Sequence, residues 1–405
     1  MESSAQGRAR SPEPSQAHAA LAGLSALLVG VGFGRFGYPP LIPALIQAGW
    51  FDAPQAAYLG ATNLTGYLLG AALAPRLALR FSGTRLIRAA LVAGTVALFA
   101  CAFPFGFGWY FLWRMLSGVA GAFLMILAGP KVLAFAPPGR RGRVGGILFM
   151  GVGLGIALSG TLVPWLVGFG LPQTWAAFGA ASVLLSALAW KGIPSVGDAR
   201  EGSGTDAARA VSRTGGARLT LPLLWFGLSY GGYAVGFVPH TVFWVDYIAR
   251  GLGEGLAVGG GYWALFGLAA GCGPLLTGWC ADHIGFRRAY RYSLLADAGF
   301  VALPLVSASS WALALSSLGV GGLAAAISSL ALGRVSELVP MAQQRQVWGW
   351  ITIAFSLLYA ASGYGMSFLF AATESYAPLF GIGAAALVLA FVLDLGASWN
   401  RGQKS

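Results

Sequence analysis

The chain has 405 residues, of which 57% are hydrophobic and only 9% are charged. Ordinary soluble domains carry about 25% charged residues, so this sequence cannot cover a water-exposed surface. The composition therefore excludes a soluble enzyme, a nucleic-acid-binding protein and a disordered chain. The three cysteines lie in apolar runs and show neither a disulfide framework nor metal-ligand spacing, so we expect no metal site and no cofactor.

Long apolar runs predict an all-α integral membrane protein with twelve transmembrane helices. A helix needs about 20 residues to cross a bilayer, and the runs are long enough for this. They do not alternate between polar and apolar residues, which argues against a transmembrane β-barrel. In chain order the predicted spans cover residues 18–47, 55–79, 85–106, 108–136, 143–169, 174–191, 219–248, 257–281, 288–307, 310–333, 346–371 and 375–397.

Polar segments divide these spans into two six-helix bundles. Residues 18–191 form the first bundle and residues 219–397 form the second, with polar tails at 1–17 and 398–405. Residues 192–218 separate the bundles and are rich in Gly, Ser and charged residues, which is typical of a linker.

The positions of the basic residues predict the orientation in the membrane. With a cytoplasmic N-terminus, 22 of the 25 Lys and Arg residues fall in cytoplasmic segments; Arg250 lies outside, and Arg35 and Arg114 lie within spans. The positive-inside rule thus predicts a multi-pass protein of the cytoplasmic (inner) membrane with both termini in the cytoplasm. The net charge of +12 then faces anionic membrane lipid and not nucleic acid.

An internal repeat with an offset of 203 residues relates the two halves. Lys131 matches Arg334 and Pro137 matches Pro340, and the register continues without a gap through the following span. Because each copy holds an even number of spans, both copies enter the membrane from the same side. The sequence therefore predicts a parallel six-plus-six repeat about an axis along the membrane normal.

This parallel repeat with a long central linker resembles the major facilitator superfamily. After the eighth span, residues 278–288 read GWCADHIGFRR, which is similar to the superfamily's G-x-L-A-D-R-x-G-R-R loop. The segments GFGRFGYPPLIP at 32–43 and NLTGYLLGAALA at 63–74 resemble its YbfB/YjiJ-type branch. The resemblance implies two bundles that rock about a central site lined by the first, fourth, seventh and tenth spans, and it supplies no substrate.

The loop after the eighth span provides the gating candidates Asp282, Arg287 and Arg288. An aspartate beside arginines can form charge-assisted hydrogen bonds that latch a cytoplasmic gate. The corresponding segment of the first half reads LAPR at 73–76 and has lost the aspartate, so only one half carries the complete motif.

Arg35 lies deep within the first span, and an ionisable residue at such a depth indicates a functional site. Pro39 and Pro40 remove the amides that would bond the carbonyl oxygens of Arg35 and Phe36, so the helix is weakened beside the cation. We predict that Arg35 and the neighbouring Tyr38 bind substrate in a cavity. The alternative is an arginine that only bonds carbonyl groups of a neighbouring helix.

Three further substrate-binding candidates are Arg114 in the fourth span and Tyr233 and His240 in the seventh. The latter two belong to an aromatic stripe at helical spacing, which either lines a cavity or packs inside the bundle. His240 and Asp297, in the ninth span, are candidates for proton coupling, with a structural hydrogen bond as the alternative. Asp246 is expected in a solvated loop at the outer surface.

We therefore predict a secondary active transporter, not an enzyme, that works by alternating access and is coupled to protons or exchange. No Walker loop, Rossmann fingerprint or zinc spacing is present in the sequence. The deep ionisable side chains favour a small organic anion as the solute. The alternatives are proton-driven efflux of lipophilic compounds and a non-transporting membrane sensor or scaffold. We expect a monomer.

Overall fold

The computed structural model describes residues 15–135, 141–193 and 218–399, and every regular element in these ranges is helical. Ten helices are long and apolar enough to cross a membrane. Two more, α3 (Ala53–Ala78) and α14 (Phe286–Val306), are of similar length but more polar, and they pack against α5 and α15 respectively. The predicted all-α fold is therefore confirmed, while most of the predicted linker at 192–218 lies outside the described residues.

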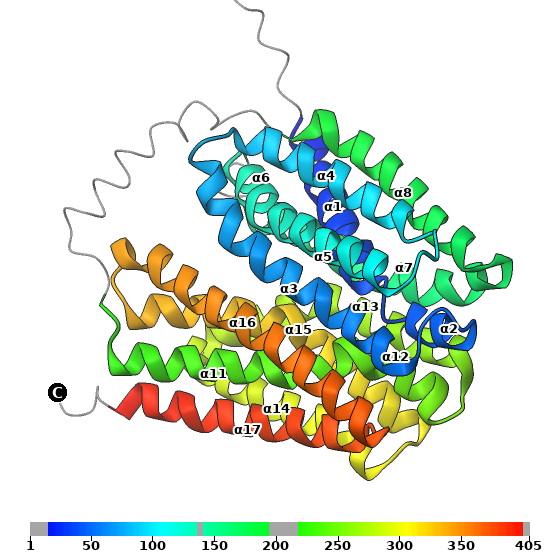
Figure 1. The fold of residues 1–405 in the computed structure, drawn as a ribbon. Coiled ribbons are helices and arrows are strands. Elements are labelled where there is room, and N and C mark those ends of the chain that lie inside the picture. Colours follow the sequence, from blue (N-terminus) through cyan, green and yellow to red (C-terminus); the bar gives the residue numbers. More distant parts are fainter. Residues whose placement is uncertain (1–14, 136–140, 194–217, 400–405) are drawn as a thin grey trace, which may run out of the picture.

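The first bundle contains the elements from α1 to α8 (Figure 1). In chain order these are α1 (Gln16–Leu27), the π-helix η1 (Leu28–Phe36), α2 (Leu41–Gln47), α3, α4 (Gly83–Ala100), α5 (Phe107–Phe123), the π-helix η2 (Leu124–Ala128), α6 (Gly129–Phe135), α7 (Arg141–Leu166), the 3-10 helix η4 (Val167–Phe169) and α8 (Leu171–Gly192).

The second bundle contains the elements from α11 to α17. These are α11 (Leu221–Val238), the π-helix η5 (Pro239–Phe243), α12 (Trp244–Asp246), the π-helix η6 (Tyr247–Gly251), α13 (Gly255–Ile284), α14, α15 (Ser310–Leu338), α16 (Met341–Thr373) and α17 (Ala377–Trp399).

The two bundles repeat the same packing pattern. In the first, α3 packs on α5, α1 packs on α7 and α8, and α4 packs on α8. In the second, α13 packs on α15, α11 packs on α16 and α17, and α14 packs on α17. These pairs correspond one to one along the chain, as a duplicated six-helix unit requires.

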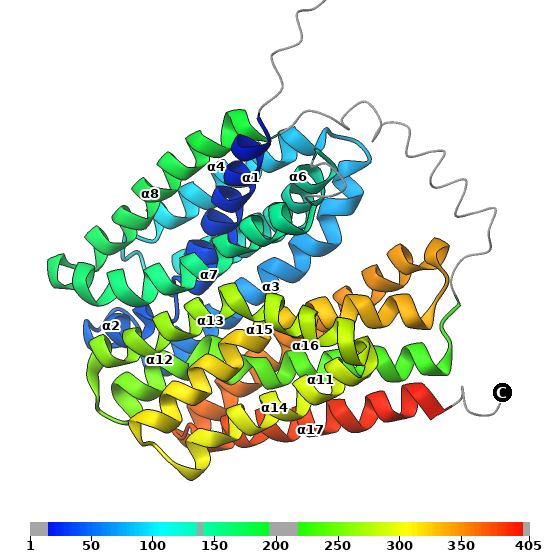
Figure 2. The same cartoon turned by 180° about the vertical axis from the view of Figure 1, so that it is seen from behind.

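The bundles meet at one end and diverge at the other, as both ribbon views show (Figures 1 and 2). The end of α8 at Gly192 lies against the start of α1, and Gly396 near the end of α17 lies against Trp225 near the start of α11. We call this the linker end, because the segment between the bundles joins α8 to α11. The opposite, far end is where α7 packs on α13 and α3 on α16, through residues in the middle and far halves of these helices.

The first predicted span, 18–47, is not one continuous helix. It runs as α1 and the π-helix η1 up to Phe36, breaks over residues 37–40, and resumes as α2. The break falls at Pro39 and Pro40, which have no amide hydrogen to donate to the preceding turn. Broken backbone inside a membrane protein requires other donors for its carbonyl groups, and the candidate site is built around them.

Candidate substrate-binding site

The carbonyl oxygen of Phe36, which the prolines leave without a helical donor, is bonded by two side chains. Ser159 Oγ on α7 donates to it at 3.1 Å. Trp263 Nε1 on α13 also donates to it at 3.1 Å, across the interface between the bundles. The weakened first span thus becomes a point at which both bundles are joined.

The carbonyl oxygen of Gly34 is bonded by three side chains of its own bundle. Arg114 Nη1 and Ser117 Oγ on α5 donate to it at 2.8 and 2.9 Å, and Asn63 Nδ2 on α3 donates at 3.3 Å. Arg114 is buried, and its guanidinium carbon lies 4.2 Å from the centre of the Tyr38 ring. Bonding the carbonyl groups of a neighbouring helix was the alternative role predicted for Arg35. In the structure Arg114 has this role.

The guanidinium of Arg35 has a different environment. Its carbon lies 4.6, 4.8 and 5.4 Å from the ring centres of Tyr359, Phe36 and Tyr67. Its buried Nε has no hydrogen-bond partner, and within the described part of the chain no carboxylate forms an ion pair with it. Aromatic faces attract a cation but accept hydrogen bonds poorly, so the donors along the edge of the guanidinium stay available to a ligand.

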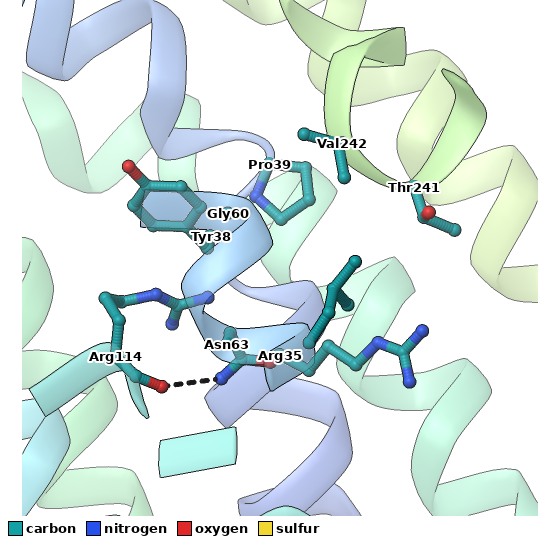
Figure 3. Close-up of a pocket in the computed structure, with 9 residues that line it drawn as sticks. Arg35, Tyr38, Pro39, Gly60, Asn63, Arg114, Thr241 and Val242 are labelled. Atoms are coloured by element: carbon teal, nitrogen blue, oxygen red, sulfur yellow. Dashed lines mark hydrogen bonds between the residues drawn. The ribbon is translucent and has the colours of Figure 1, made fainter. Parts of the chain in front are cut away.

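A small pocket lies beside Arg35 at the interface of the two bundles (Figure 3). Arg35 extends away from Arg114, towards the element of the second bundle that carries Thr241 and Val242. The residues that line the pocket are Arg35, Tyr38, Pro39, Gly60, Asn63, Leu64, Arg114, Thr241 and Val242. The structure thus brings together three of the five predicted substrate-binding residues: Arg35, Tyr38 and Arg114.

Charge in this region is unbalanced. In the sequence, Asp52 is the only acidic residue from position 14 through 197. Asp52 is exposed at the far end, where its carboxylate accepts from the amide of Gln55 at 2.7 Å and caps α3. The first bundle therefore holds two arginines at the pocket and has no carboxylate of its own beside them.

The other two substrate-binding candidates lie outside this pocket, inside the second bundle. The Tyr233 hydroxyl donates to the carbonyl of Ala324 on α15 at 2.6 Å. His240 is fully buried, stacked on Trp244 with ring centres 4.4 Å apart. Its Nε2 bonds Ser316 Oγ at 2.8 Å.

Both candidates for proton coupling have a buried atom without a partner. Because the Ser316 hydroxyl donates to the carbonyl of Phe300, it accepts from His240 Nε2, which leaves Nδ1 of the imidazole unbonded. Asp297 on α14 is 1% exposed, and its Oδ1 also has no hydrogen-bond partner. These two side chains are set within the second bundle, apart from the pocket at the interface.

Tyr359 and Asn63 are site residues that the sequence analysis did not single out. Tyr359 on α16 contacts Arg35, and its hydroxyl bonds Thr241 Oγ1 at 2.6 Å. Asn63 lies on α3, in the segment NLTGYLLGAALA at 63–74 that resembles the YbfB/YjiJ-type branch. A polar side chain within an apolar span was a signal that could have identified it as a site residue. The position of Tyr359 on a long apolar helix gave no comparable signal.

The predicted gating residues Asp282, Arg287 and Arg288 lie at the linker end, where α13 is followed by α14, and all three are exposed. Gly285 between these helices has φ of +82°, a conformation that favours glycine, as the motif requires. Within the described residues these three side chains form no ion pair. Their gating role stays a prediction.

A buried ion-pair cluster occupies the linker end of the second bundle instead. Asp394 on α17 is fully buried and bonds Arg291 Nε on α14 at 2.7 Å. Arg334 on α15 lies 3.5 Å from the other Asp394 oxygen and bonds Glu337 at 2.8 Å. Asp394 was not among the predicted site residues, although an isolated carboxylate in the last apolar run was a usable signal.

We expect Asp394→Asn to lower the free energy of unfolding by about 3–5 kcal/mol, because it removes one partner of a buried charge pair. The measurement is the melting temperature of the purified protein in detergent. Asp282→Asn is the matched control: its side chain is exposed, so the melting temperature should not change, whereas transport should fall if Asp282 acts in the gate. Equal melting temperatures for both variants would contradict the expected role of Asp394.

The sequence predicted that Asp246 lies in a solvated loop at the outer surface. In the structure this prediction is wrong, because Asp246 is buried, with 2% of its surface exposed. Arg250 bonds both of its carboxylate oxygens, at 2.6 and 2.8 Å, and the Tyr376 hydroxyl donates to it at 2.6 Å. The seventh span continues through α12 and η6 to Gly251, so Asp246 lies within helical structure that packs on α13. This cluster joins the end of that span to the segment between α16 and α17.

Comparison with known proteins identifies the family of the chain. Residues 27–395 match the family described as "Uncharacterised MFS-type transporter YbfB". A stretch of 118 residues is 30% identical to "Probable sphingolipid transporter spinster homolog 1" from Arabidopsis thaliana. That match covers 29% of this chain and 24% of the relative, so it spans about a quarter of that protein.

Similar solved structures include a D-xylose–proton symporter, with a TM-score of 0.71, 16% identity, and coverage of 92% of this chain and 95% of that chain. The inward-open conformation of the xylose transporter XylE from E. coli has a TM-score of 0.72 at 14% identity, covering 93% and 94%. At these identities the likeness establishes the fold alone.

Proposed function

Because the chain belongs to the YbfB-type family of major facilitator transporters, we propose that it is a secondary transporter whose solute is a small organic anion bound by Arg35. The observation that carries this proposal is the Arg35 guanidinium, which lines an interface pocket without a hydrogen-bond or ion-pair partner among the described residues. A charged group within a membrane protein is costly unless something pairs with it, and an anionic solute is such a partner.

The fold supports transport by alternating access. The pocket is lined by residues of both bundles, and the bundles diverge towards the linker end. In repeat-based transporters, one bundle rocks against the other around a site at their interface. The XylE structure has the same overall fold.

The positions of the basic residues support an orientation in the membrane, because 22 of the 25 Lys and Arg residues fall in segments predicted to be cytoplasmic. We propose that the linker end faces the cytoplasm of a cell whose inner membrane holds the protein. In a chain whose native cysteines are replaced by serine, cysteines introduced at Gln16 or His283, which are exposed at the linker end, should react with an impermeant thiol reagent only from the cytoplasmic side. Labelling of either position from outside intact cells would reverse the orientation.

We propose that Asp297 carries the coupling proton, because it is buried in the second bundle with an oxygen that lacks a partner. Asp297→Asn should abolish uptake driven by a proton gradient while sparing exchange of solute across the membrane. Both rates are measured in proteoliposomes with the labelled anion that the wild-type protein transports best. Equal loss of the two activities would assign Asp297 to binding or folding instead. His240→Gln, tested alongside, decides whether the imidazole shares this role.

Two alternative functions, efflux of a lipophilic solute and a non-transporting sensor or scaffold, can be distinguished from anion transport by measuring solute uptake. The relative named as a probable sphingolipid transporter favours an amphipathic or lipophilic solute, although it matches over a short stretch. Proteoliposomes should be tested with labelled lactate, benzoate, succinate, xylose and tetraphenylphosphonium. The proposal expects uptake of carboxylates. Uptake of only the neutral or cationic probes would refute it, and absence of any flux would favour a sensor or scaffold.

A further inference from the structure

Three buried polar atoms without partners belong to residues that line the interface pocket. Among the described residues, eleven buried side-chain nitrogen or oxygen atoms have no hydrogen-bond partner, and these include Arg35 Nε, Arg114 Nε and Asn63 Oδ1. Buried polar groups in proteins are nearly always bonded, so three exceptions around one pocket require an explanation. Figure 3 shows the three side chains around the same space.

The orientation of the Asn63 amide is determined by its neighbours. Its Nδ2 donates to the carbonyl oxygen of Arg114 at 3.1 Å (Figure 3) and to that of Gly34 at 3.3 Å. A carbonyl oxygen only accepts, so rotating the amide by half a turn would place oxygen against oxygen twice. Asn63 Oδ1 is therefore an acceptor, and Asn63 is 1% exposed.

The pocket lining thus combines cationic donors with one buried neutral acceptor, Asn63 Oδ1, that has no partner among the described residues. A carboxylate accepts hydrogen bonds but donates none, so it satisfies the arginines and leaves Asn63 Oδ1 unbonded. The complete ligand must also carry a donor. An ammonium group is a poor choice, because two arginines and no carboxylate line the pocket and like charges repel at close range.

We infer that the solute is a hydroxycarboxylate, whose carboxylate binds Arg35 and whose hydroxyl donates to Asn63 Oδ1. This inference rests on the proposed anion transport and narrows its substrate class. The ligand's hydroxyl would donate a hydrogen bond to Asn63 Oδ1, which has no partner in the described part of the structure. Its carboxylate would accept charge-assisted hydrogen bonds from the edge of the Arg35 guanidinium.

Two matched sets of acids test the hydroxyl without changing the protein. The first set is lactate, propionate and alanine, and the second is mandelate, phenylacetate and phenylglycine. Within each set the group on the carbon beside the carboxylate changes from hydroxyl to hydrogen to ammonium. Calorimetric binding to the purified wild-type protein should show the hydroxy acid of at least one set binding about tenfold more tightly than its two analogues.

Asn63→Ala should remove the preference for the hydroxy acid while leaving the affinity for the unsubstituted acid nearly unchanged. The variant also loses two bonds to backbone carbonyls, so its folding is checked by size-exclusion chromatography, and the wild-type comparison stands if it fails to fold. Thr65→Ala is the control on the same helix, because its hydroxyl bonds only the Ala61 carbonyl of its own helix.

The outcomes separate this inference from the proposed function. If acids bind through Arg35 but the hydroxyl gives no advantage in either set, the hydroxycarboxylate inference is wrong and anion transport stands. If the amino acids bind most tightly, the hydroxycarboxylate inference is wrong and the preferred solute is a zwitterion, which also contradicts the proposed anion transport. If no acid of either set binds, the inference is also wrong. If binding of acids does not depend on Arg35, the proposed function fails as well.

Discussion

Arg35→Lys is expected to weaken binding of the transported anion by about 1–3 kcal/mol, which is roughly a 5- to 150-fold loss of affinity. Lysine keeps the positive charge but lacks the planar fork that can offer two parallel hydrogen bonds to a carboxylate. It also loses the flat surface that lies near the rings of Tyr359, Phe36 and Tyr67. Arg35→Ala should cause a larger loss, because it removes the charge altogether.

The measurement is the affinity of the purified variants for the anion that the wild-type protein binds best, beside their melting temperatures. Arg76→Ala is the control for loss of a cation, because Arg76 is exposed near the linker end and bonds only the carbonyl of Ala72 on its own helix. Affinity should be unchanged in this control. Unchanged affinity and a lower melting temperature for Arg35→Lys would make Arg35 a structural residue.

The helical fold and the break in the first span were predictable, because both depend on local properties. Apolar runs of sufficient length define membrane helices, and proline cannot bond the preceding turn wherever it occurs. The donors that bond the Phe36 carbonyl were not predictable. Ser159 and Trp263 lie 123 and 227 residues away in the sequence, and only the packing of α7 and α13 brings them there.

The roles of the two intramembrane arginines could not be separated by sequence. Both are isolated cations in apolar helices beside glycines, and the greater predicted depth of Arg35 does not indicate which groups either side chain contacts. The difference arises from tertiary structure: Arg114 bonds the Gly34 carbonyl, whereas Arg35 lies among aromatic rings. A single chain without its three-dimensional neighbours contains no signal for this distinction.

The aromatic stripe of the seventh span was a misleading guide to the pocket. Spacings of three and four residues place side chains on one face of a helix but do not indicate what that face contacts. In the structure Tyr233 stacks on Phe237 and His240 stacks on Trp244. This face packs inside the second bundle, where Tyr233 bonds the Ala324 carbonyl and His240 bonds Ser316, while Thr241 reaches the interface.

Gly160→Val is expected to open the far end of the transporter. A Cβ atom at Gly160 on α7 would lie 2.5 Å from the carbonyl oxygen of Gly260 and 2.6 Å from the amide nitrogen of Ala264 on α13. Both are backbone atoms, so the clash cannot be relieved by rotating a side chain. Overpacking of this kind typically costs about 1–3 kcal/mol, which shifts a two-state equilibrium about 5- to 150-fold towards the state in which the bundles separate.

Accessibility of the pocket from the far side reports this shift. Val242 is buried and lines the pocket, so Val242→Cys in a chain whose native cysteines are replaced by serine should react slowly with an impermeant maleimide added to that side. Adding Gly160→Val should raise the labelling rate about fivefold or more. Gly146→Val is the matched control on the same helix, because among the described residues no atom outside its chain neighbours and its own helix backbone lies within 4 Å of its Cβ position. Equal labelling rates in the two variants would show that contact between α7 and α13 does not hold the far end closed.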